Sequence, residues 1–338
     1  MTATRRAWVG ALVGLTLGVA GCGSSGSGAT SGSHTGAHQS KTTRVRHAAA
    51  AGPQRLAYRT LFSLPAPLRD PATAPVGSSQ AALLGGLNSA DTSTDQVDVV
   101  NRHGLVYSGS LPNVQHDAQA ATLAGQVYVF GGGSLSELNH ILGFNPSGHV
   151  VRPVGVLPSA SSDVAVTQVG NTAYIVGGYD GTSYLNTILA WQPGQAAKVV
   201  GHTPEGLRYS AVTAVGGKVI IVGGSTPAGA SRAIYSFDPV SGQVKTIGQL
   251  PRPITHGGAA ALGNYVYLVG GRGDLVTETT PDIWSINPTT GTVAAAGRLP
   301  HGLSDAGVVT VGQGIMVAGG FSGTNTVAGV GELVPGAA

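Results

Sequence analysis

Charge is scarce in this chain, and it is unevenly distributed. Only 10% of the 338 residues are charged, and residues 1–55 carry six basic residues but no acidic one. The remaining residues hold 12 basic and 15 acidic side chains, a net charge of −3. A nucleic-acid-binding domain would present a basic surface. The composition therefore excludes that class of partner, and the pI of about 9.1 reflects the N-terminal segment.

Motifs of the common enzyme classes are absent as well. The sequence has no Gly-x-Ser-x-Gly nucleophile elbow, no His-Glu-x-x-His zinc motif and no phosphate-binding loop. Helix-forming residues are sparse, whereas Val, Thr, Tyr and Gly are plentiful. This composition indicates an all-β protein with many tight turns.

Cysteine occurs once, as Cys22, at the end of a secretory signal. Arg5 and Arg6 precede an apolar run over residues 7–20, which is too short to span a membrane comfortably. The run ends in Val-Ala-Gly-Cys, which resembles a bacterial lipobox. The resemblance implies a signal peptide over residues 1–21, lipidation of Cys22 and anchoring on the extracytoplasmic face. The alternative is an ordinary secreted protein with an incidental cysteine.

Residues 22–53 are rich in Ser, Gly and His and poor in large apolar side chains. Such a segment cannot bury enough apolar surface to offset its chain entropy, so we expect a disordered tether. His34, His38 and His47 lie in it; metal binding there is possible, but solvated linker histidines are the favoured interpretation. The folded domain is expected to begin at residue 54 and to continue to residue 338.

One short pattern recurs throughout that domain: an apolar strand that ends in two glycines. The six doublets are Gly85-Gly86, Gly131-Gly132, Gly177-Gly178, Gly223-Gly224, Gly270-Gly271 and Gly319-Gly320. Their first glycines are 46, 46, 46, 47 and 49 residues apart. Six copies in phase at this period indicate a repeat architecture.

Each repeat predicts four antiparallel strands. In the fifth copy, residues 259–262 and 265–269 flank a Gly-Asn turn and form a hairpin. A third strand follows at 282–286, and a fourth follows a Pro-led turn at 293–298. A Leu-Pro pair then ends the repeat, since Pro cannot continue a ladder. Six such units are typical of a β-propeller.

The glycine doublet, the aromatic-x-Pro turn and the period of about 46 residues resemble kelch repeats. The resemblance implies a six-bladed propeller like the central domain of galactose oxidase. The fourth strands lack the usual kelch Trp and offer Tyr107, Val199 or Ile247. The last copy ends after its third strand, whereas residues 56–62 look like a fourth strand without a blade. We therefore expect the N-terminal strand to close the last blade, which would abolish the open edges.

Strand direction places the Leu-Pro loops, the inner-strand starts and the loops after the doublets on one face. Longer and more varied loops usually carry function. A ring of polar residues is predicted at the channel mouth on this face, at or beside the inner-strand starts: Asp117, Asp163, Arg208, Tyr209, His256 and Asp305. Asp70 lies one position out of phase, with Arg69 and His116 nearby. Turn stabilisation by each Asp is the competing interpretation.

Further side chains on the same loops are candidate contacts. They are Arg69, Tyr179, Tyr184, Arg252, Arg272 and Phe321. The aromatic ones could stack on a sugar ring or receive a peptide, although partial packing is the commoner role of such residues.

These features predict a lipid-anchored binding or scaffold module with a protein or carbohydrate ligand, no cofactor and no contact with the membrane beyond the anchor. Kelch-like copper oxidases need a Cys cross-linked to a Tyr, and Cys22 is already assigned to the lipobox. Kelch-like epimerases of sialic acid use polar residues at the channel mouth. A mutarotase or epimerase acting through this face is therefore the alternative, with Arg69, Arg208, Arg252, Asp163, His256 and Asp305 for carboxylate capture and proton transfer. A third interpretation is a propeller stabilised by a metal.

Overall fold

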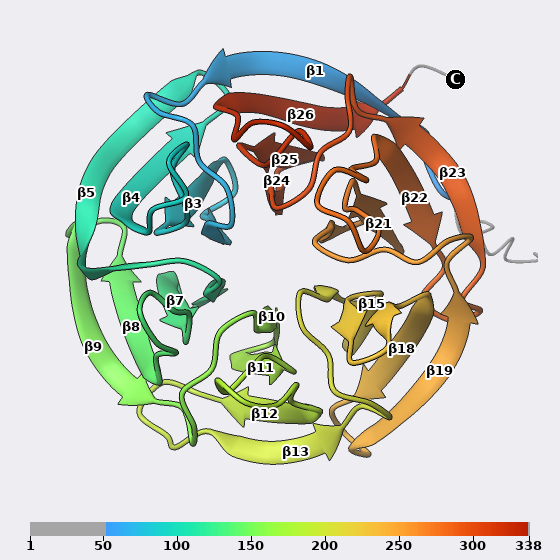
Figure 1. Ribbon diagram of the computed structural model, residues 1–338, viewed down its shortest axis with the longest axis horizontal. Helices are drawn as coiled ribbons and strands as arrows, with labels where there is room; N and C mark the ends of the chain where they lie inside the picture. The colour runs from blue at the N-terminus through green and yellow to red at the C-terminus, as the bar shows by residue number, and fades with distance from the viewer. Residues whose placement is uncertain (1–51, 337–338) are drawn as a thin grey trace, which may run out of the picture. The chain divides into compact units, whose positions relative to one another are not determined.

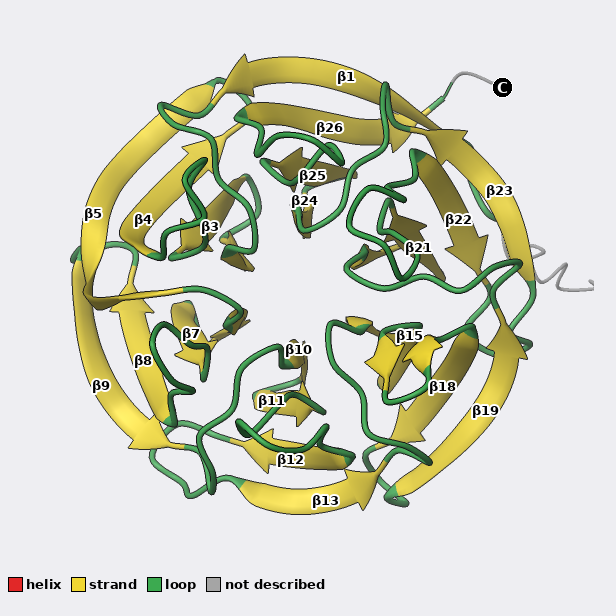
Figure 2. Ribbon diagram, in the orientation of Figure 1, coloured by secondary structure: helices red, strands yellow, loops and turns green. Residues whose placement is uncertain are grey.

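The computed structural model describes residues 52–336, and every regular element in this range is a β-strand. Six four-stranded antiparallel sheets stand like blades around a central axis (Figure 1). No helix appears among these residues (Figure 2), and so none that could cross a membrane. The predicted all-β, six-bladed propeller is confirmed. Cys22, the expected signal peptide and almost all of the expected tether fall outside the described residues.

Within each blade the four strands follow one another from the axis outward. The first three blades are β2 (Ala72–Val76), β3 (Gln80–Leu84), β4 (Thr94–Asn101) and β5 (Gly104–Gln115); β6 (Gln119–Leu123), β7 (Gln126–Phe130), β8 (His140–Asn145) and β9 (Val150–Val156); and β10 (Ala165–Val169), β11 (Thr172–Val176), β12 (Thr187–Trp191) and β13 (Lys198–His202).

The remaining blades follow the same plan. They are β14 (Ala211–Val215), β15 (Lys218–Val222), β18 (Ala233–Asp238) and β19 (Gln243–Gln249); β20 (Gly258–Leu262), β21 (Tyr265–Val269), β22 (Asp282–Ile286) and β23 (Val293–Arg298); and β24 (Gly307–Val311), β25 (Gly314–Ala318), β26 (Gly329–Pro335) and β1 (Leu56–Ser63). A two-stranded hairpin of β16 (Ser225–Thr226) and β17 (Gly229–Ala230) extends from the fourth blade.

The sixth blade is closed by the two ends of the domain. β1 pairs antiparallel with β26, from Leu56 opposite Pro335 to Ser63 opposite Gly329, with a bulge between Thr60 and Phe62. In Figure 1 the blue β1 lies outside the red β26 and completes the ring. The expected closure by the N-terminal strand is therefore confirmed.

The core lies between the blades, because each sheet is apolar on both faces and each face is covered by a neighbour. Trp191 at the end of β12 is 1% exposed. Its ring packs edge-on against Tyr128 and Phe130 of the preceding blade, at centroid distances of 4.9 and 5.4 Å. Aromatic pairs of this geometry add to the gain from burial. Packing of this kind recurs around the ring and fixes the angle between neighbouring blades.

The glycine doublets join the blades to one another. The second glycine of each doublet donates its N–H to a carbonyl of the segment that leads into the next blade, over 2.8–2.9 Å in all six cases. The first glycine has φ between +59° and +66°, and a Cβ at Gly177 would lie 2.3 Å from the Leu207 carbonyl oxygen. Only glycine fits both this backbone conformation and this close approach. The repeated doublet is therefore the connection between blades.

Candidate functional site

Six residues from six blades surround the channel mouth and share one backbone conformation. We name this set the mouth ring: Asp70, Asp117, Asp163, Tyr209, His256 and Asp305, with φ between 51° and 58°. In five of the six steps around the ring, the N–H of one member donates to the carbonyl of the member before it, over 2.8–3.3 Å. The ring is thus tied together by its own backbone, and its side chains are held at the mouth.

The left-handed conformation suits some members of the mouth ring better than others. Asp tolerates positive φ several-fold more often than most residues, whereas a bulky residue such as Tyr209 is an outlier there. Residues in such conformations cluster at functional sites, where the surroundings compensate the strain. Tyr209 therefore marks the ring as more than a set of turns.

Asp70 belongs to the mouth ring although its spacing to Gly85 is one residue longer than in the other repeats. The extra residue lies in the hairpin turn between β2 and β3, at the far end of the strand. Counted from the start of the inner strand, Asp70 occupies the same place as Asp117. Its N–H bonds the Asp305 carbonyl at 2.8 Å. The equivalence of Asp70 and Asp117 is not visible when residues are counted back from the glycine doublet.

The mouth ring lines one cavity of about 60 Å³. The side chains of Asp163, Asp305, His256 and Asp117 are 1%, 6%, 8% and 12% exposed. These four residues and Tyr209 are the ring positions expected from the repeat phase, and all of them line this cavity. The expected neighbours Arg208 and Arg69 also reach this region.

The carboxyl groups of the ring disfavour one another's ionisation. Burial, followed by the nearby Asp305 and Asp117 charges, holds the pKa of Asp70 well above its usual range. Burial and the adjacent Asp163 do the same to the pKa of Asp117. Burial also raises the pKa of Asp305. Carboxyls of this kind retain protons at pH values where ordinary ones are ionised. They can donate as well as accept hydrogen bonds.

His256, the neighbour of Asp305 in the mouth ring, is held neutral. Burial, together with the charges of Arg272, Arg208 and Arg69, lowers its pKa well below the usual value. Arg272 Nη2 lies 3.0 Å from His256 Nε2, and the Thr255 hydroxyl lies 2.9 Å from Nδ1. Because a guanidinium can only donate, Nε2 accepts and Nδ1 carries the proton. Both ring nitrogens are thus already engaged.

Tyr209 connects the histidine to the acids. Its ring stacks on that of His256 with centroids 3.7 Å apart, and its hydroxyl donates to Asp117 Oδ2 over 3.2 Å. Burial raises the pKa of Tyr209, so the hydroxyl stays protonated. The polar groups of the mouth are consequently linked across the ring rather than acting singly.

Three arginines surround the acids on the loop side. Arg208 Nε bonds Asp163 Oδ2, and its guanidinium lies over the rings of Tyr179 and Tyr184 at 4.3 and 5.0 Å. Arg69 lies 4.9 Å from the centroid of the Phe321 ring and pairs with Asp91 at 3.0 Å. The third, Arg272, contacts His256. The predicted aromatic loop residues therefore contact two of the arginines through cation–π interactions.

Several buried polar atoms of this site have no hydrogen-bond partner within residues 52–336. They are Asp163 Oδ1 and Asp305 Oδ1 among the acceptors, and Arg69 Nε and Arg272 Nε among the donors. His256 Nε2 is 3.9 Å from Asp305 Oδ1, beyond hydrogen-bonding distance. An unpaired buried polar group costs about 1–3 kcal/mol. The unpaired acceptors thus belong to acids of the mouth ring, and the unpaired donors belong to two of the arginines beside them.

Arg252 does not join the mouth. Its guanidinium bonds Thr280 and Asp282 of its own blade, and Arg298 bonds the same Asp282 at 2.8 Å. The Leu-Pro loop that carries Arg252 shares the functional face, but its side chain is committed to the outer part of the fifth blade.

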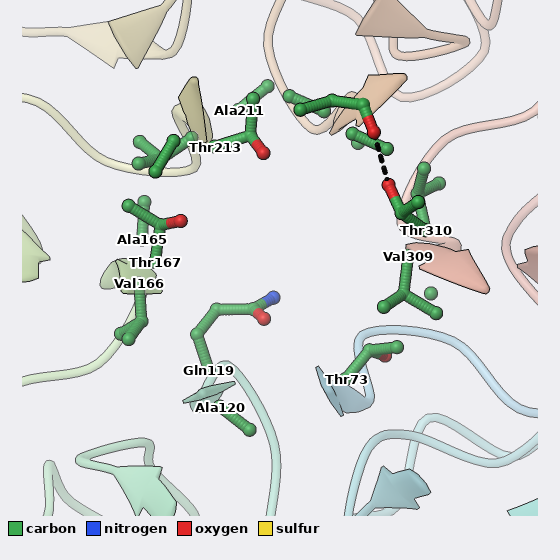
Figure 3. Close-up of a pocket in the computed structure, with 18 of the residues that line it drawn as sticks. Thr73, Gln119, Ala120, Ala165, Val166, Thr167, Ala211, Thr213, Val309 and Thr310 are labelled. Carbon is green, nitrogen blue, oxygen red and sulfur yellow. Dashed lines mark hydrogen bonds between the residues drawn. The ribbon is translucent and has the colours of Figure 1, made fainter. Parts of the chain in front are cut away.

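Below the mouth, the inner strands enclose a channel of about 320 Å³. Figure 3 shows its wall of small and hydroxyl-bearing side chains, with Thr310 bonded to the Ala261 carbonyl of the neighbouring blade at 2.6 Å. The Gln119 side chain extends from β6 into this space. Neither the channel lining nor Gln119 was identified from the sequence; the one available signal was a long polar residue in a position otherwise held by Ala or Gly.

The acids do not form a metal site in their present arrangement. No group of three or more His, Cys, Asp or Glu side chains between residues 52 and 336 is placed to hold a metal ion. The geometry of the described part of the chain thus offers a polar cavity with mixed donors and acceptors instead.

Comparisons with known proteins agree with the architecture. A model of the kelch motif matches residues 160–195 and 206–251, which correspond to the third and fourth blades. A search of curated proteins found no match. The solved structure of YjhT aligns with a TM-score of 0.68 at 16% identity, over 80% of this chain and 96% of that one. The chain is therefore a six-bladed β-propeller with kelch motifs in its third and fourth blades.

Proposed function

We propose that this propeller is a binding module whose channel mouth takes a small hydroxylated anion. The observation that carries the proposal is one cavity lined by all four aspartates of the mouth ring, with arginines bonded to ring members beside it: Arg208 to Asp163 and Arg272 to His256. A ligand with an anionic group and several hydroxyls suits such surroundings, because hydroxyls donate as well as accept.

The arginines favour a carboxylate as the anionic group. Guanidinium groups present a planar fork of donors that matches a carboxylate. Arg69 and Arg272 each keep an unpartnered buried Nε. Arg208 is less available, because its partner Asp163 is almost wholly buried, whereas Asp91, the partner of Arg69, is 71% exposed. We therefore assign the recognition of the anion to Arg69 and Arg272.

The acids favour hydroxyls as the remaining groups. Asp70, Asp117 and Asp305 have raised pKa values, so their repulsion of an anion is reduced. Protonated and ionised carboxyls together offer donors and acceptors to neighbouring hydroxyls. The aromatic rings of Tyr179 and Phe321 sit against the arginines and help to fix their orientation.

The test is a titration of the purified full chain by calorimetry and thermal shift. A ligand that binds the native state raises the apparent stability by mass action. We expect glycerate and threonate to raise the melting temperature, and neutral glycerol and erythritol to do so far less. Substitution of both Arg69→Met and Arg272→Met should abolish the response, whereas Arg252→Met, the matched control outside the mouth, should preserve it. Equal binding of the acids and the neutral polyols would contradict the proposal.

A sugar-modifying enzyme that uses the same mouth is the second candidate. It is favoured by the presence of several buried carboxyls with raised pKa values in one cavity, since such groups can hold and release a proton near neutral pH. The engaged state of both His256 nitrogens argues against His256 as its base. Anomer exchange measured by NMR with the wild type and with a His256→Ala, Asp305→Ala double variant would decide. Turnover unchanged in the variant would remove these residues from any such reaction.

We also propose that the protein is exported and anchored by lipid at Cys22. The support is the signal-like sequence before Cys22 and its position as the single cysteine. Labelled palmitate should enter the wild type but not a Cys22→Ser variant. The variant should then move from the membrane fraction to the soluble fraction. Retention of both label and membrane association in the variant would refute this assignment.

A further inference from the structure

Gln119 breaks the symmetry of the channel directly below the mouth ring. It is the first residue of β6, and the first residues of the other inner strands are all small: Ala72, Ala165, Ala211, Gly258 and Gly307. One blade therefore places a long amide side chain where five place a methyl group or a hydrogen.

The wall at this level has little room for larger side chains between strands. A Cβ at Gly258 would lie 2.3 Å from a Val308 methyl group, and one at Gly307 would lie 2.7 Å from Thr73 Oγ1. Such distances require a neighbour to move. Gln119 is accommodated because its side chain extends into the lumen instead of between the strands (Figure 3).

The Gln119 amide lies at the boundary between two spaces. Gln119 contributes to the lining of both the mouth cavity and the channel below it. It is partly exposed, and its amide forms no hydrogen bond with other residues of the described range. By contrast, Gln168, which also lines the channel, accepts a hydrogen bond from the Thr122 N–H over 3.2 Å. Gln119 therefore has a free donor and a free acceptor facing the lumen.

We propose that Gln119 is the floor of the mouth site and limits the length of ligand that the mouth accepts. This inference rests on the proposed binding of a hydroxylated carboxylate. The mouth cavity of about 60 Å³ accommodates about four to six water-sized groups at 10–15 Å³ each. A short hydroxy acid fits this space with its carboxylate directed toward the arginines beside the ring and its far hydroxyl at the Gln119 amide. A longer one must displace the amide to enter the channel.

The experiment measures affinities for a series of aldonates, each longer than the last by one hydroxymethylene: glycerate, threonate, xylonate and gluconate. The full chain is compared as wild type, as Gln119→Ala and as Gln168→Ala, the matched control. Five blades already carry a small residue at this level, so Gln119→Ala is expected to fold normally. We expect it to improve the affinity for gluconate relative to glycerate by about tenfold or more, equivalent to 1.4 kcal/mol, and Gln168→Ala to leave that ratio unchanged.

Two results would overturn the inference in different ways. If wild type and Gln119→Ala bind the series with the same relative affinities, the mouth binds hydroxy acids but Gln119 is not its floor. The same holds if Gln119→Ala weakens every member by one common factor, since Gln119 then contacts the ligand without limiting its length. If no member binds the wild type, and the Arg69→Met, Arg272→Met variant behaves identically, the proposed function itself fails.

Discussion

Two sets of residues surround the channel on the same face, and they obey different rules. The glycine doublets are chemically identical in all six blades and make the same inter-blade hydrogen bond six times. The mouth ring keeps one backbone conformation in all six blades, yet it carries four aspartates, a tyrosine and a histidine. The need to join the blades explains why the glycine doublets are identical. It does not explain why the side chains of the mouth ring differ from blade to blade.

The difference shows how a repeat can be interpreted residue by residue. Where all copies share a residue and a contact, the architecture suffices as a reason. Where the backbone repeats but the side chain changes, the fold has left the choice open and another requirement has made it. The same reasoning singles out Gln119 among five small residues. Sites in repeat proteins are thus found at the exceptions within an otherwise regular position.

The largest expected effect on stability comes from opening the sixth blade, which β1 closes. Deletion of residues 56–63 from the full chain removes the strand that covers β26 along its whole length. It also removes the buried Leu56 and leaves an open edge. We expect a loss of several kcal/mol, which corresponds to a fall in melting temperature of about 10 °C or more. Circular dichroism melts measure it, and an unchanged melting temperature would show that the sixth blade is complete without β1.

A smaller effect is expected from one doublet. Gly177→Ala adds a Cβ 2.3 Å from the Leu207 carbonyl oxygen at φ +61°, whereas Gly170→Ala adds one at φ +59° with nothing within 4 Å. The backbone strain of about 1 kcal/mol is common to both. We expect Gly177→Ala to lose at least about 3 kcal/mol in urea unfolding. If both variants lose the same amount, close approach is not the reason for the doublet.

At the mouth, the pair of Asp163 with the adjacent Arg208 should be coupled more strongly than a surface pair. Asp163 is almost wholly enclosed, so a double-mutant cycle of Asp163→Asn and Arg208→Met should give about 1–3 kcal/mol. The exposed Lys218–Asp238 pair, at 3.3 Å, should give less than about 1 kcal/mol. Equal coupling energies in the two cycles would mean that enclosure contributes nothing to the pair.

The smallest effect concerns pH. Because the folded protein raises the pKa of Asp117, it binds that proton more tightly than the unfolded chain. The stabilisation is complete below the ordinary Asp pKa of about 3.9 and is lost as pH rises through the folded value. Asp117→Asn should therefore gain stability over the wild type with rising pH, by about 1.4 kcal/mol for each pH unit that separates the folded pKa from the ordinary one.

The matched control for this pH series is Asp180→Asn. Hydrogen bonds from Ser183 and Thr182 lower the pKa of Asp180, so its stabilisation is lost only as pH falls below the ordinary Asp pKa. The difference between wild type and Asp180→Asn should therefore stay flat from pH 4 to pH 8. Denaturant unfolding from pH 4 to pH 8 provides the comparison. A flat difference between wild type and Asp117→Asn across this range would contradict the raised pKa.

The sequence was sufficient to predict the architecture, because the pattern that specifies one blade occurs six times. The doublets, the Pro-led turns and the unpaired segment at residues 56–62 predicted the blades and their closure, and β1 pairs with β26 as expected. Strand direction also predicted which face gathers the loops. Phase alone brought Asp117, Asp163, Tyr209, His256 and Asp305 to one cavity.

The position of a residue within the repeat does not predict where a long side chain points. It also does not predict which turn accommodates an additional residue. Asp70 seemed displaced because the additional residue sits in the hairpin turn beyond its strand. Arg252 shares the loop face but turns to Asp282 in its own blade. Gln119 resembles any strand residue until the six inner strands are placed around a common lumen. Each of these depends on contacts between segments distant in sequence, which periodicity does not encode.

The pairing of β1 with β26 also sets an order of events during biosynthesis. The first strand of the domain to be made must wait for the last one, since Leu56 lies opposite Pro335 and Ser63 opposite Gly329. The first five blades contain all their own strands and can assemble earlier, as domains made vectorially tend to do. The mouth ring closes between Asp305 and Asp70 only at this final step. A chain that stops short of residue 329 therefore lacks both the closed sixth blade and the closed mouth ring, so binding at the mouth depends on the pairing of β1 with β26.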